Sequence, residues 1–529
     1  MQAQTKGKGM TSRGTDEIIF LITLFATLLG STIKTNTLFA QTTPAGIIRH
    51  DVVWSGQINI TGDVTVIDAT IRVEPGSKIR FLSAGYTTFG PVLRLNSPSL
   101  LAGREATCAK LILAGTTQRP IIVETPQDMP PGAIVAGPRT CGSIIARHVI
   151  FRRLGTPTSD KRSKPSIQLQ LASPDNDFWI SDCRFENCGP VRGEFFGPGA
   201  GAQIEKNVFA NTSGDVTLFI TGTGSGIKVI AGNIADAAFR IECPQTLIVD
   251  NILVGESAAI TIPAANAGAV TIARNYVHCT TGRDQGKYVL RCQTTEAVVK
   301  DNVLIGGTYV IESAPRLVKG NVLIGVAGLE ATFNVPDLDV KKLKSTTMTH
   351  YLITNLAPQA VVADNLLLGP CYAAVATGKR TDSPRIEHNL FDGWNQAHRA
   401  VHFNRLTRKP SAAELNRNII IRYKNPPLCD QARVANTLAR AGKNVFADVP
   451  EVLYEKIDTI TGLAPGDKRL DNFNQIGFQS PLTTQTVDSY QDRLLKRQIT
   501  VDQIRDVWFV AYRLRKDAPF MQTDPIGPR

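Results

Sequence analysis

Three of the chain's seven histidines fall in one short stretch, RIEHNLFDGWNQAHRAVHFNR (385–405). Histidine exchanges protons near neutral pH, arginine pairs with carboxylates through a planar fork, and the flat ring of tryptophan stacks on sugar rings. Together these residue types predict a site for an acidic sugar polymer. We expect proton transfer and charge neutralisation from His398, His402, Arg399 and Asp392, and substrate contacts from Trp394, Arg405 and His388.

The same stretch also fits the surface of an ordinary strand. The alternation in HRAVHFNR puts His402 and Asn404 on one face of a strand, and His388 directly precedes an asparagine of the repeat described below. The H-x3-H spacing binds a metal ion only on a helix, which this run does not clearly form. We therefore expect no metal site here, and the alternative to a carbohydrate site is a set of surface side chains without a binding role.

A second cluster of charged and polar residues surrounds a glycine-containing turn in ARNYVHCTTGRDQGKYVLRC (273–292). Loops that project from a regular scaffold often build binding grooves. The cluster adds four candidate substrate-binding residues, which are Arg274, His278, Arg283 and Lys287. The alternative is a solvated basic loop.

A repeated phrase indicates the element that must position these residues. The pattern is an apolar residue, two variable residues, Asn, one variable residue and a second apolar residue, and its asparagines recur with a mean spacing of about 24 residues. A period of this length predicts a solenoid, in which each repeat is one turn. The asparagines are Asn207, Asn233, Asn251, Asn275, Asn302, Asn321, Asn365, Asn389, Asn418 and Asn444.

Two kinds of solenoid have a period near this value. Leucine-rich repeats need further leucines five and eight residues before the Asn, and before Asn251 those positions hold Thr246 and Cys243. The short β-branched runs broken by Gly, Asn and Pro suit instead a parallel β-helix, with three strands per coil. The asparagines would then form a hydrogen-bonded ladder at one corner, so we expect a structural role for them.

The region before the first Asn also predicts coils. The stretch DVVWSGQINITGDVTVIDATIRVEPGSKIRF (51–81), the turn and strand GTTQRPIIVET (115–125) and the ending AYRLRKDAPFMQTDPIGPR (511–529) resemble secreted bacterial proteins of the pectin-lyase-like superfamily. That resemblance implies a right-handed parallel β-helix, here of about 15 coils. It does not imply an activity, because the superfamily includes lyases, hydrolases, epimerases and adhesins. The hydrolase motifs N-T-D, D-D, G-H-G and R-I-K are absent from the chain.

Composition favours an anionic partner. The chain carries 58 Lys and Arg against 46 Asp and Glu, a net charge of +12. Without a run of five basic residues or an aromatic-rich basic strip, nucleic acid is not expected, and an anionic polysaccharide or envelope glycan is. We predict no cofactor, since nothing in the sequence supports the Ca²⁺ that some such enzymes use, and we expect a monomer.

The N-terminus resembles a signal peptide. Lys6, Lys8 and Arg13 precede the apolar run IIFLITLFATLLG (18–30), and a cleavage point follows Ala40. An uncleaved anchor is the alternative; no later segment is apolar enough to span a membrane. We therefore expect a secreted, periplasmic or cell-surface protein. The nine cysteines lack metal-type CxxC pairs and are either small buried hydrophobes or, as with Cys183/Cys188 and Cys279/Cys292, disulfide-bonded.

A helix is expected after the repeats fade. In TVDQIRDVWFVAYRL, the residues Ile504, Val507, Trp508 and Ala511 recur at helical spacing, and Thr500 with Gln503 forms a capping box. We expect this helix to cap the open end of the solenoid, with docking of a partner as the alternative. The predicted organisation is a signal peptide (1–40), the β-helix (41–480) and a helical cap with a closing segment (481–529).

The sequence thus supports two functional hypotheses. In the first, an exported β-helix protein binds or modifies an acidic polysaccharide, with enzyme activity of lyase or hydrolase type undecided. In the second, it is a structural or adhesive surface protein without an active site, because no family catalytic set is present.

Overall fold

The computed structural model describes most of the chain after residue 45. The described residues are 46–83, 90–96, 109–136, 142–156, 164–171, 177–197, 199–210, 216–263, 268–280, 288–313, 315–326, 349–377, 383–403, 413–430, 438–451, 453–455, 463–478, 484–516, 518 and 527–528. By its internal contacts the chain divides into Met1–Phe39 and Ala40–Arg529, and every described residue belongs to the second unit.

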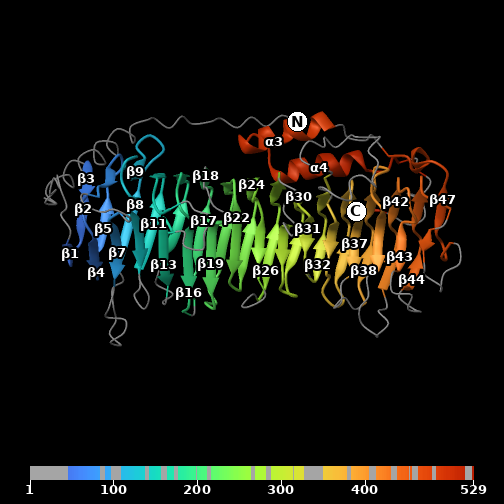
Figure 1. Ribbon diagram of the computed structural model, residues 1–529, viewed down its shortest axis with the longest axis horizontal. Coiled ribbons are helices and arrows are strands. Elements are labelled where there is room, and N and C mark those ends of the chain that lie inside the picture. The colour runs from blue at the N-terminus through green and yellow to red at the C-terminus, as the bar shows by residue number, and fades with distance from the viewer. Residues whose placement is uncertain are drawn as a thin grey trace, which may run out of the picture. The chain divides into compact units, whose positions relative to one another are not determined.

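Strands of this unit form three long parallel sheets, and each coil contributes one strand to each sheet (Figure 1). A strand therefore pairs with the strand three places later in the chain, as β27 pairs with β30, except at the end, where β45 pairs with β47. Short parallel strands need a connection that returns the chain to the same edge, and here the other two sides of the coil supply it. The predicted parallel β-helix is confirmed.

Among the described residues, sheet 1 contains sixteen strands. They are β1 Gly46–Ile48, β4 Val64–Ile67, β7 Val92–Asn96, β10 Ala133–Ala136, β13 Ile167–Leu171, β16 Val191–Phe195, β19 Val216–Gly222, β22 Ala238–Glu242, β25 Ile260–Ile262, β28 Tyr288–Cys292, β31 Tyr309–Glu312, β34 Tyr351–Thr354, β37 Ala373–Thr377, β40 Arg399–Phe403, β43 Leu428–Asp430 and β46 Tyr454–Glu455.

Fifteen strands of the described part of the chain form sheet 2. They are β2 Val52–Trp54, β5 Thr70–Val73, β8 Ala109–Ala114, β11 Gly142–Arg147, β14 Phe178–Ser181, β17 Ala202–Glu205, β20 Lys228–Ala231, β23 Thr246–Val249, β26 Val270–Ala273, β29 Val298–Lys300, β32 Leu317–Lys319, β35 Val361–Ala363, β38 Arg385–Glu387, β41 Ala413–Asn416 and β44 Leu438–Gly442.

Sheet 3 contains sixteen strands within the ranges that the structure describes. They are β3 Gln57–Ile60, β6 Lys78–Phe81, β9 Ile121–Glu124, β12 Val149–Arg152, β15 Arg184–Glu186, β18 Val208–Ala210, β21 Ile234–Ala235, β24 Ile252–Gly255, β27 Tyr276–Cys279, β30 Val303–Gly306, β33 Val322–Ile324, β36 Leu366–Leu368, β39 Leu390–Asp392, β42 Ile419–Ile421, β45 Val445–Ala447 and β47 Lys468–Leu470.

The core lies inside the coils and is almost entirely apolar. Strand residues alternate between the interior and the exterior, so one continuous cluster of Ile, Leu, Val, Phe and Ala runs from Trp54 to Leu453. Phe151, Phe185 and Phe209 stack on one another within it, with ring centroids 4.6 and 4.8 Å apart. The described cysteines, all but Cys108 and Cys141, are buried free thiols. Burial raises the pKa of Cys183, Cys188, Cys243 and Cys292 to about 12, so these thiols are packing residues.

All ten asparagines of the repeat lie fully buried at the corner between sheets 2 and 3. From Asn233 on, each side-chain oxygen accepts from the backbone and side-chain nitrogens of the asparagine one coil earlier; Asn302 Oδ1, for example, accepts from Asn275 N at 2.9 Å and Asn275 Nδ2 at 3.0 Å. Asn207 Oδ1, the first of the ten, accepts from the backbone nitrogen of Cys183. Asp467 accepts in the same way from Asn444 and ends the ladder. The Asn pattern did not include Asp467, whose carboxylate supplies the acceptor oxygen of Asn but has no amide group to donate.

The residue before each ladder asparagine has a left-handed backbone conformation. Asp250, Arg274, Asp301 and His388 have φ between 51° and 60°, and Gly320 has 68°. This conformation turns the chain sharply between sheets 2 and 3 and points the side chain outward. The corner therefore carries a row of variable side chains, one per coil, outside the invariant ladder.

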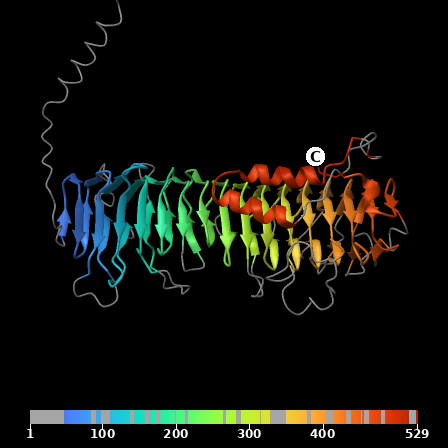
Figure 2. The ribbon, with the colours of Figure 1, turned by 90° about the horizontal axis from the view of Figure 1, so that it is seen from above.

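Two helices, α3 Thr484–Leu495 and α4 Val501–Ala511, follow the last strand, after the short 3₁₀ turn η2 Phe473–Ile476. The capping box of α4 is present, with Gln503 N donating to Thr500 Oγ1 at 3.3 Å and Thr500 N donating to Gln503 Oε1 at 2.9 Å. Both helices lie beside the stacked coils, with their axes along the long axis of the solenoid (Figures 1 and 2). We expected α4 over the open end of the solenoid; instead it covers a side of it.

An apolar outer face on sheet 3 is the reason for this position. From β24 to β45 the outward residues of sheet 3 are largely Ile, Val and Leu, and they form a second cluster with Ile504, Trp508 and Ala511 of α4. A sheet that is apolar on both faces must be shielded from water on both, and the amphipathic helix shields the outer face. No helix among the described residues is long and apolar enough to cross a membrane.

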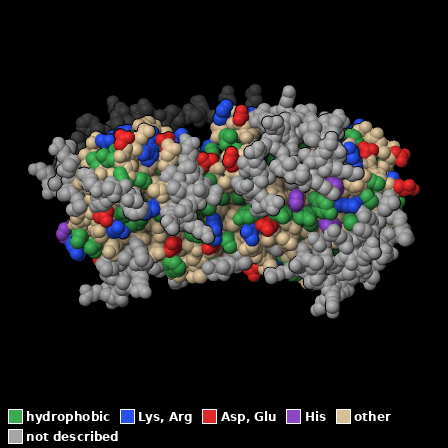
Figure 3. All heavy atoms as spheres, in the orientation of Figure 1, with side chains coloured by type: hydrophobic (Ala, Val, Ile, Leu, Met, Phe, Trp, Pro, Cys, Tyr) green, Lys and Arg blue, Asp and Glu red, His purple; other side chains and the backbone are tan. Residues whose placement is uncertain are grey.

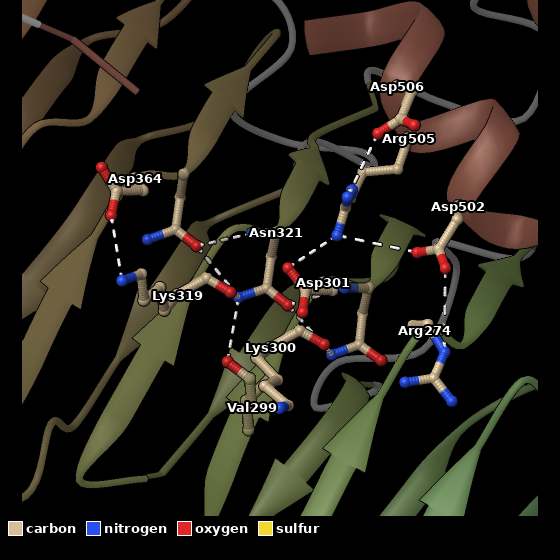
Figure 4. Close-up of polar contacts among 12 residues, drawn as sticks. Arg274, Val299, Lys300, Asp301, Lys319, Asn321, Asp364, Asp502, Arg505 and Asp506 are labelled. Carbon is tan, nitrogen blue, oxygen red and sulfur yellow. Dashed lines mark hydrogen bonds and ion pairs between the residues drawn. The ribbon is translucent and has the colours of Figure 1, made fainter. Parts of the chain in front are cut away.

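Ion pairs attach α4 to the row of corner side chains (Figure 4). Arg505 Nη1 lies 2.6 Å from Asp301 Oδ1, and Asp502 Oδ2 lies 3.8 Å from Arg274 Nε. Arg274 also holds Asp250 through two hydrogen bonds of 2.8 and 2.9 Å. Charges at the corner thus fix the helix laterally, while its apolar side packs on sheet 3.

Candidate functional site

The outer face of sheet 1 carries a different set of residues from sheet 3. One register column passes through Arg192, Phe219, Arg240, Thr261, Arg291, Glu312, Thr354, Ala376 and His402, each paired with the next across neighbouring strands. We call the outward side chains of β16 to β40 the sheet 1 face. Polar and aromatic side chains alternate along it with small ones, so the face is both chemically varied and uneven.

Aromatic rings contact one another along the C-terminal half of this face. Tyr309 and Tyr351 are register partners whose rings stack with centroids 5.9 Å apart, and Tyr372 meets Tyr351 edge-on at 6.0 Å. Tyr288 is the register partner of Tyr309 on the preceding coil. We call Tyr309, Tyr351 and Tyr372 the tyrosine stack. Because parallel strands are about 4.8 Å apart, the stack places one partly exposed ring on each successive coil.

Two of the predicted catalytic histidines extend the tyrosine stack. The rings of His398 and His402 lie 5.7 and 5.5 Å from the ring of Tyr372. Burial and the neighbouring tyrosines raise the pKa of Tyr351, so its hydroxyl keeps its proton at neutral pH and can donate it in a hydrogen bond. The space-filling view shows histidine side chains beside a hydrophobic area on this side of the molecule (Figure 3).

Arginines and a phenylalanine form a second stack towards the N-terminal end of the face. The guanidinium carbons of Arg192 and Arg240 lie 5.7 and 5.4 Å from the ring centroid of Phe219, one on each neighbouring strand. A guanidinium over an aromatic face is held by the ring quadrupole and still offers hydrogen-bond donors at its edge. Each of these arginines is close to a carboxylate, as Arg240 is to Glu242 at 2.5 Å.

A hollow of about 330 Å³ separates the two stacks. Its lining combines the small residues Ala238, Ala259 and Thr261 with Arg240 of β22 and Tyr288 of β28. Glu256 and Ser257, from the turn between β24 and β25, also line it. The face therefore offers a depression for one ring-sized group, with flat aromatic surfaces and guanidinium groups extending from it in both directions.

Asp392 lies apart from the two histidines. It is the last residue of β39 on sheet 3, and its fully buried side chain pairs with Arg422 and accepts a hydrogen bond from Tyr512 at 2.9 Å. The Trp394 backbone donates to the same carboxylate, and the Trp394 indole donates to the Tyr512 hydroxyl at 3.3 Å. The predicted grouping of Asp392 and Trp394 with the histidines is therefore not present.

Arg399 stays near the histidines, on β40, and its Nη1 donates to the carbonyl of Pro426 at 2.5 Å. His388, in contrast, occupies the corner between sheets 2 and 3, directly before the ladder residue Asn389, with φ of 57° and little exposure. Of the described residues in the first predicted cluster, Arg399 and His402 thus lie on β40 of sheet 1, and His398 directly precedes that strand. Arg405 lies outside the described residues.

Helix docking accounts for the described members of the second predicted cluster. Arg274 pairs with Asp250 and Asp502, and those contacts raise its pKa. His278 Nδ1 lies 2.8 Å from Oε1 of Gln491 on α3, which also accepts from the Tyr276 hydroxyl. Both residues belong to the covered side of the solenoid. Arg283 and Lys287 lie outside the described residues.

A periodic signal in the sequence could have identified the tyrosines. Tyr288, Tyr309, Tyr351 and Tyr372 are separated by 21, 42 and 21 residues, so they recur with the coils. The asparagines recur in the same way, but their column lies at another corner of the coils. Within the described part of the chain, no group of three or more His, Cys, Asp or Glu residues is arranged to hold a metal ion.

Comparisons with known proteins add little to this geometry. No protein-family model matches the chain, and no curated protein matches it by sequence. A search of solved structures finds a crystal structure of a periplasmic alginate epimerase, which is 8% identical and aligns over 80% of this chain and 78% of that chain with a TM-score of 0.20. At that TM-score the match has no weight in the functional argument.

Proposed function

We propose that this chain is an exported protein of the pectin-lyase-like superfamily that binds an acidic polysaccharide along the sheet 1 face. The proposal takes its envelope location from the basic and apolar N-terminal segment and its superfamily from the motifs of the first coils. The site itself is proposed from the contacts of the described residues.

The tyrosine stack is the observation that carries the proposal. Partly exposed tyrosine rings on consecutive coils form a ridge of ring edges and hydroxyl groups, against which the C–H groups and hydroxyls of successive sugar rings can pack. A polymer can follow such a stack over several coils, whereas a compact ligand would use only part of it. Rigid strands hold the rings, so little conformational entropy is lost when a polymer binds.

Arginines give the face its preference for an acidic chain. Arg192, Arg240 and Arg291 lie in one register column with the hollow between them, and each can present guanidinium donors to a carboxylate. The neighbouring glutamates lower the net charge of the face and can accept from sugar hydroxyls. Such a mixed surface selects an acidic sugar over a bare polyanion.

His398 provides the chemistry that would turn binding into modification, because it is partly exposed beside Tyr372, whereas His402 is only 2% exposed. A histidine at this position can exchange protons with a sugar held against Tyr372. Release of unsaturated uronate, measured as absorbance near 235 nm, would add lyase activity to the proposed binding. Binding without any product would leave the protein as a polysaccharide-binding solenoid.

The test is a binding titration with polygalacturonate, alginate and hyaluronan, and with dextran as the uncharged polymer. Tyr351→Ala removes the central ring of the stack, and we expect at least a tenfold weaker affinity, equal to about 1.4 kcal/mol. The matched control is Trp179→Ala, which removes an aromatic side chain that is 45% exposed on sheet 2. Its affinity should equal that of the wild type.

Two results would contradict the proposal. One is equal affinity of the wild type and Tyr351→Ala for every acidic polymer. The other is binding of dextran as tight as that of the acidic polymers, because then the arginines would have no part in selection. Affinity for the correct polymer should also fall as salt is raised from 50 mM to 500 mM, since part of the attraction is between charges.

A further inference from the structure

Arginines recur on every second coil between β16 and β28 of the sheet 1 face. Strands β16, β22 and β28 each place an arginine in the register column, and the strands between them place an uncharged side chain there. The arginines are Arg192, Arg240 and Arg291, and the residues that alternate with them are Phe219 and Thr261. Because parallel strands stack about 4.8 Å apart, successive arginines are about 10 Å apart along the solenoid, and an extended disaccharide has about the same length.

A glutamate accompanies each arginine but is less accessible to a ligand. The side chain of Arg240 is 48% exposed, and that of its partner Glu242, 2.5 Å away, is 19% exposed. Arg291 is likewise more exposed than its partner Glu312, which lies 3.4 Å away. A ligand that approaches from solvent therefore meets the guanidinium first. Since each glutamate offsets the charge of its arginine, binding depends on alignment with the arginines rather than on a surplus of positive charge.

The arginines and glutamates of β16 and β22 lie in two separate columns. Arg192 and Arg240 belong to the first register column. Glu194 and Glu242 lie two residues further along their strands, in a second outward column that passes through Thr221. Residues two apart in a strand are about 7 Å apart and point to the same side of the sheet. A sugar chain that runs along the solenoid between these columns would have a basic edge and an acidic edge.

The stereochemistry of an extended polysaccharide gives these two edges a consequence. In a β-1,4-linked chain each sugar is turned over relative to its neighbour, so the substituents at C6 point alternately to the two edges. A carboxylate at the basic edge can pair with a guanidinium. At the acidic edge a carboxylate would be repelled by Glu194 or Glu242, whereas a hydroxymethyl group can donate a hydrogen bond to either of them.

We infer that the polysaccharide bound by this face alternates an acidic sugar with a neutral one and places its carboxylates at Arg192, Arg240 and Arg291. The inference rests on the proposed function, because it needs a polysaccharide along the sheet 1 face, and it adds the spacing of charge on that polymer. The hollow lined by Thr261 falls at a neutral position of this register, so the neutral sugar has room there for a substituent.

The experiment compares three β-1,4-linked hexasaccharides that differ only in their carboxylates. One has glucose at every position, one has glucuronate at every second position, and one has glucuronate at every position. Calorimetric titration of the full-length protein measures a Kd for each. We expect the alternating hexasaccharide to bind about tenfold more tightly than the neutral one and about fivefold more tightly than the fully acidic one.

Glu242→Gln tests the acidic edge, and Glu205→Gln is its matched control. Glu205 is a partly exposed glutamate of β17 on sheet 2, away from the sheet 1 face. Loss of the Glu242 charge should reduce the preference for the alternating over the fully acidic hexasaccharide to about twofold, whereas Glu205→Gln should keep the wild-type preference. Thermal melting curves would confirm that both variants are folded.

The outcomes separate this inference from the proposed function. Equal or tighter binding of the fully acidic hexasaccharide to the wild type would overturn the inference alone, because an acidic polysaccharide would still bind. An unchanged preference in Glu242→Gln, or the same reduction in both variants, would also overturn it, since the acidic edge would then have no part in selection. If neither charged hexasaccharide bound more tightly than the neutral one, the inference and the proposed function would both fail.

Discussion

Sheets 1 and 3 belong to the same coils and have the same backbone pairing, yet their outer faces differ completely. Between β24 and β42 the outer face of sheet 3 is apolar and covered by α3 and α4, whereas sheet 1 presents tyrosines, arginines, glutamates and histidines. The interior of the coils is apolar beneath both sheets. The apolar interior stabilises the coils whatever residues lie outside. Each outer face can therefore either dock a helix or bind a ligand.

Sheet 3 itself shows the same contrast along its length. Over β6 to β15 its outer positions are charged and paired across strands, as in Lys78–Glu124 at 2.8 Å and Arg152–Glu186 at 2.7 Å. No described helix covers that half. The helices lie where outward apolar residues begin, which indicates that the composition of the face, rather than the length of the tail, determines their position.

Removal of residues 484–529 should have the largest effect. Without α3 and α4 the apolar outer residues of sheet 3 become a long exposed patch, and patches of this kind drive association. We expect most of the truncated protein to elute as aggregates in size-exclusion chromatography and to bind a hydrophobic dye. A soluble, monodisperse truncated chain would mean that the helices are not needed as a cover.

Breaking the ladder should affect both faces together. Asn302→Ala removes the acceptor for two nitrogens of Asn275 and leaves buried groups unsatisfied, at a cost of about 4 kcal/mol in the free energy of unfolding. Hydrogen exchange should increase in sheets 1 and 3 of the same coils. An increase confined to sheet 3 would show that the two faces do not depend on one frame.

Trp508→Ala should weaken the docked face alone. The side chain is 4% exposed between α4 and sheet 3, so its loss should cost about 3 kcal/mol. Chemical denaturation would measure this change, with the exposed Trp179→Ala as a control that stays within about 0.5 kcal/mol of the wild type. Affinity of the folded Trp508→Ala for an acidic polysaccharide should be unchanged.

Tyr351→Ala should give the reverse result. We expect the tenfold loss of polysaccharide affinity described above and a change of less than about 1 kcal/mol in stability, because the ring is only partly buried. Binding and denaturation measured on the same preparations of both variants test the separation directly. If either variant lost affinity and stability in equal measure, the two faces would not have separate roles.

The smallest effect should come from the charges that fix α4. Burial raises the pKa of Asp502 above its ordinary value of 3.8, against the opposing effects of Arg505 and Arg274. The folded state then holds the proton more tightly, so stability falls as pH rises from 3.8 through the raised pKa. Over that pH range the free energy of unfolding of Asp502→Asn should therefore increase relative to that of the wild type. The increase should be no more than about 0.5 kcal/mol, because the carboxyl group is partly exposed.

Glu186, on the half of sheet 3 that no described helix covers, should give the opposite dependence of stability on pH. Burial opposes its ionisation, but hydrogen bonds from Arg152 and Arg184 outweigh it and lower the pKa below the ordinary 4.5. The wild type should be more stable than Glu186→Gln above pH 4.5, and this advantage should disappear as pH falls through the lowered pKa. Chemical denaturation of the wild type, Asp502→Asn and Glu186→Gln at several acidic pH values would measure both pH dependences. This account would be contradicted if the stabilities of the two variants relative to the wild type changed in the same direction with pH.

Much of the fold could be predicted because it depends on local repetition. The Asn pattern places a tight corner in each coil, and the β-branched runs place strands on either side of it, so neither needs long-range information. Helix α4 was equally predictable from its spacing and capping box. Its position was not, since that required knowing which outward residues of distant coils become neighbours and form an apolar face.

The candidate site was predicted only in part for the same reason. His398 and His402 were found as a local cluster, but Asp392, ten residues before His402, faces another side of the coil because the chain turns a corner between β39 and β40. Tyr309 and Tyr351 are 42 residues apart and in contact. Closeness in sequence thus misled us at Asp392, and distance in sequence concealed the tyrosine stack.

The sequence by itself determined the coil, its corner ladder and the helix that follows, because each of these is encoded by the types and spacing of residues within one or two turns. Only the tertiary structure decided which side chains share a face, where α3 and α4 lie, and that Asp392 faces a cavity beside Arg422 and Tyr512. The physical reason is that outward positions tolerate almost any residue. Their role is set by the neighbours that stacking brings together, and those neighbours lie a full coil or more away along the chain.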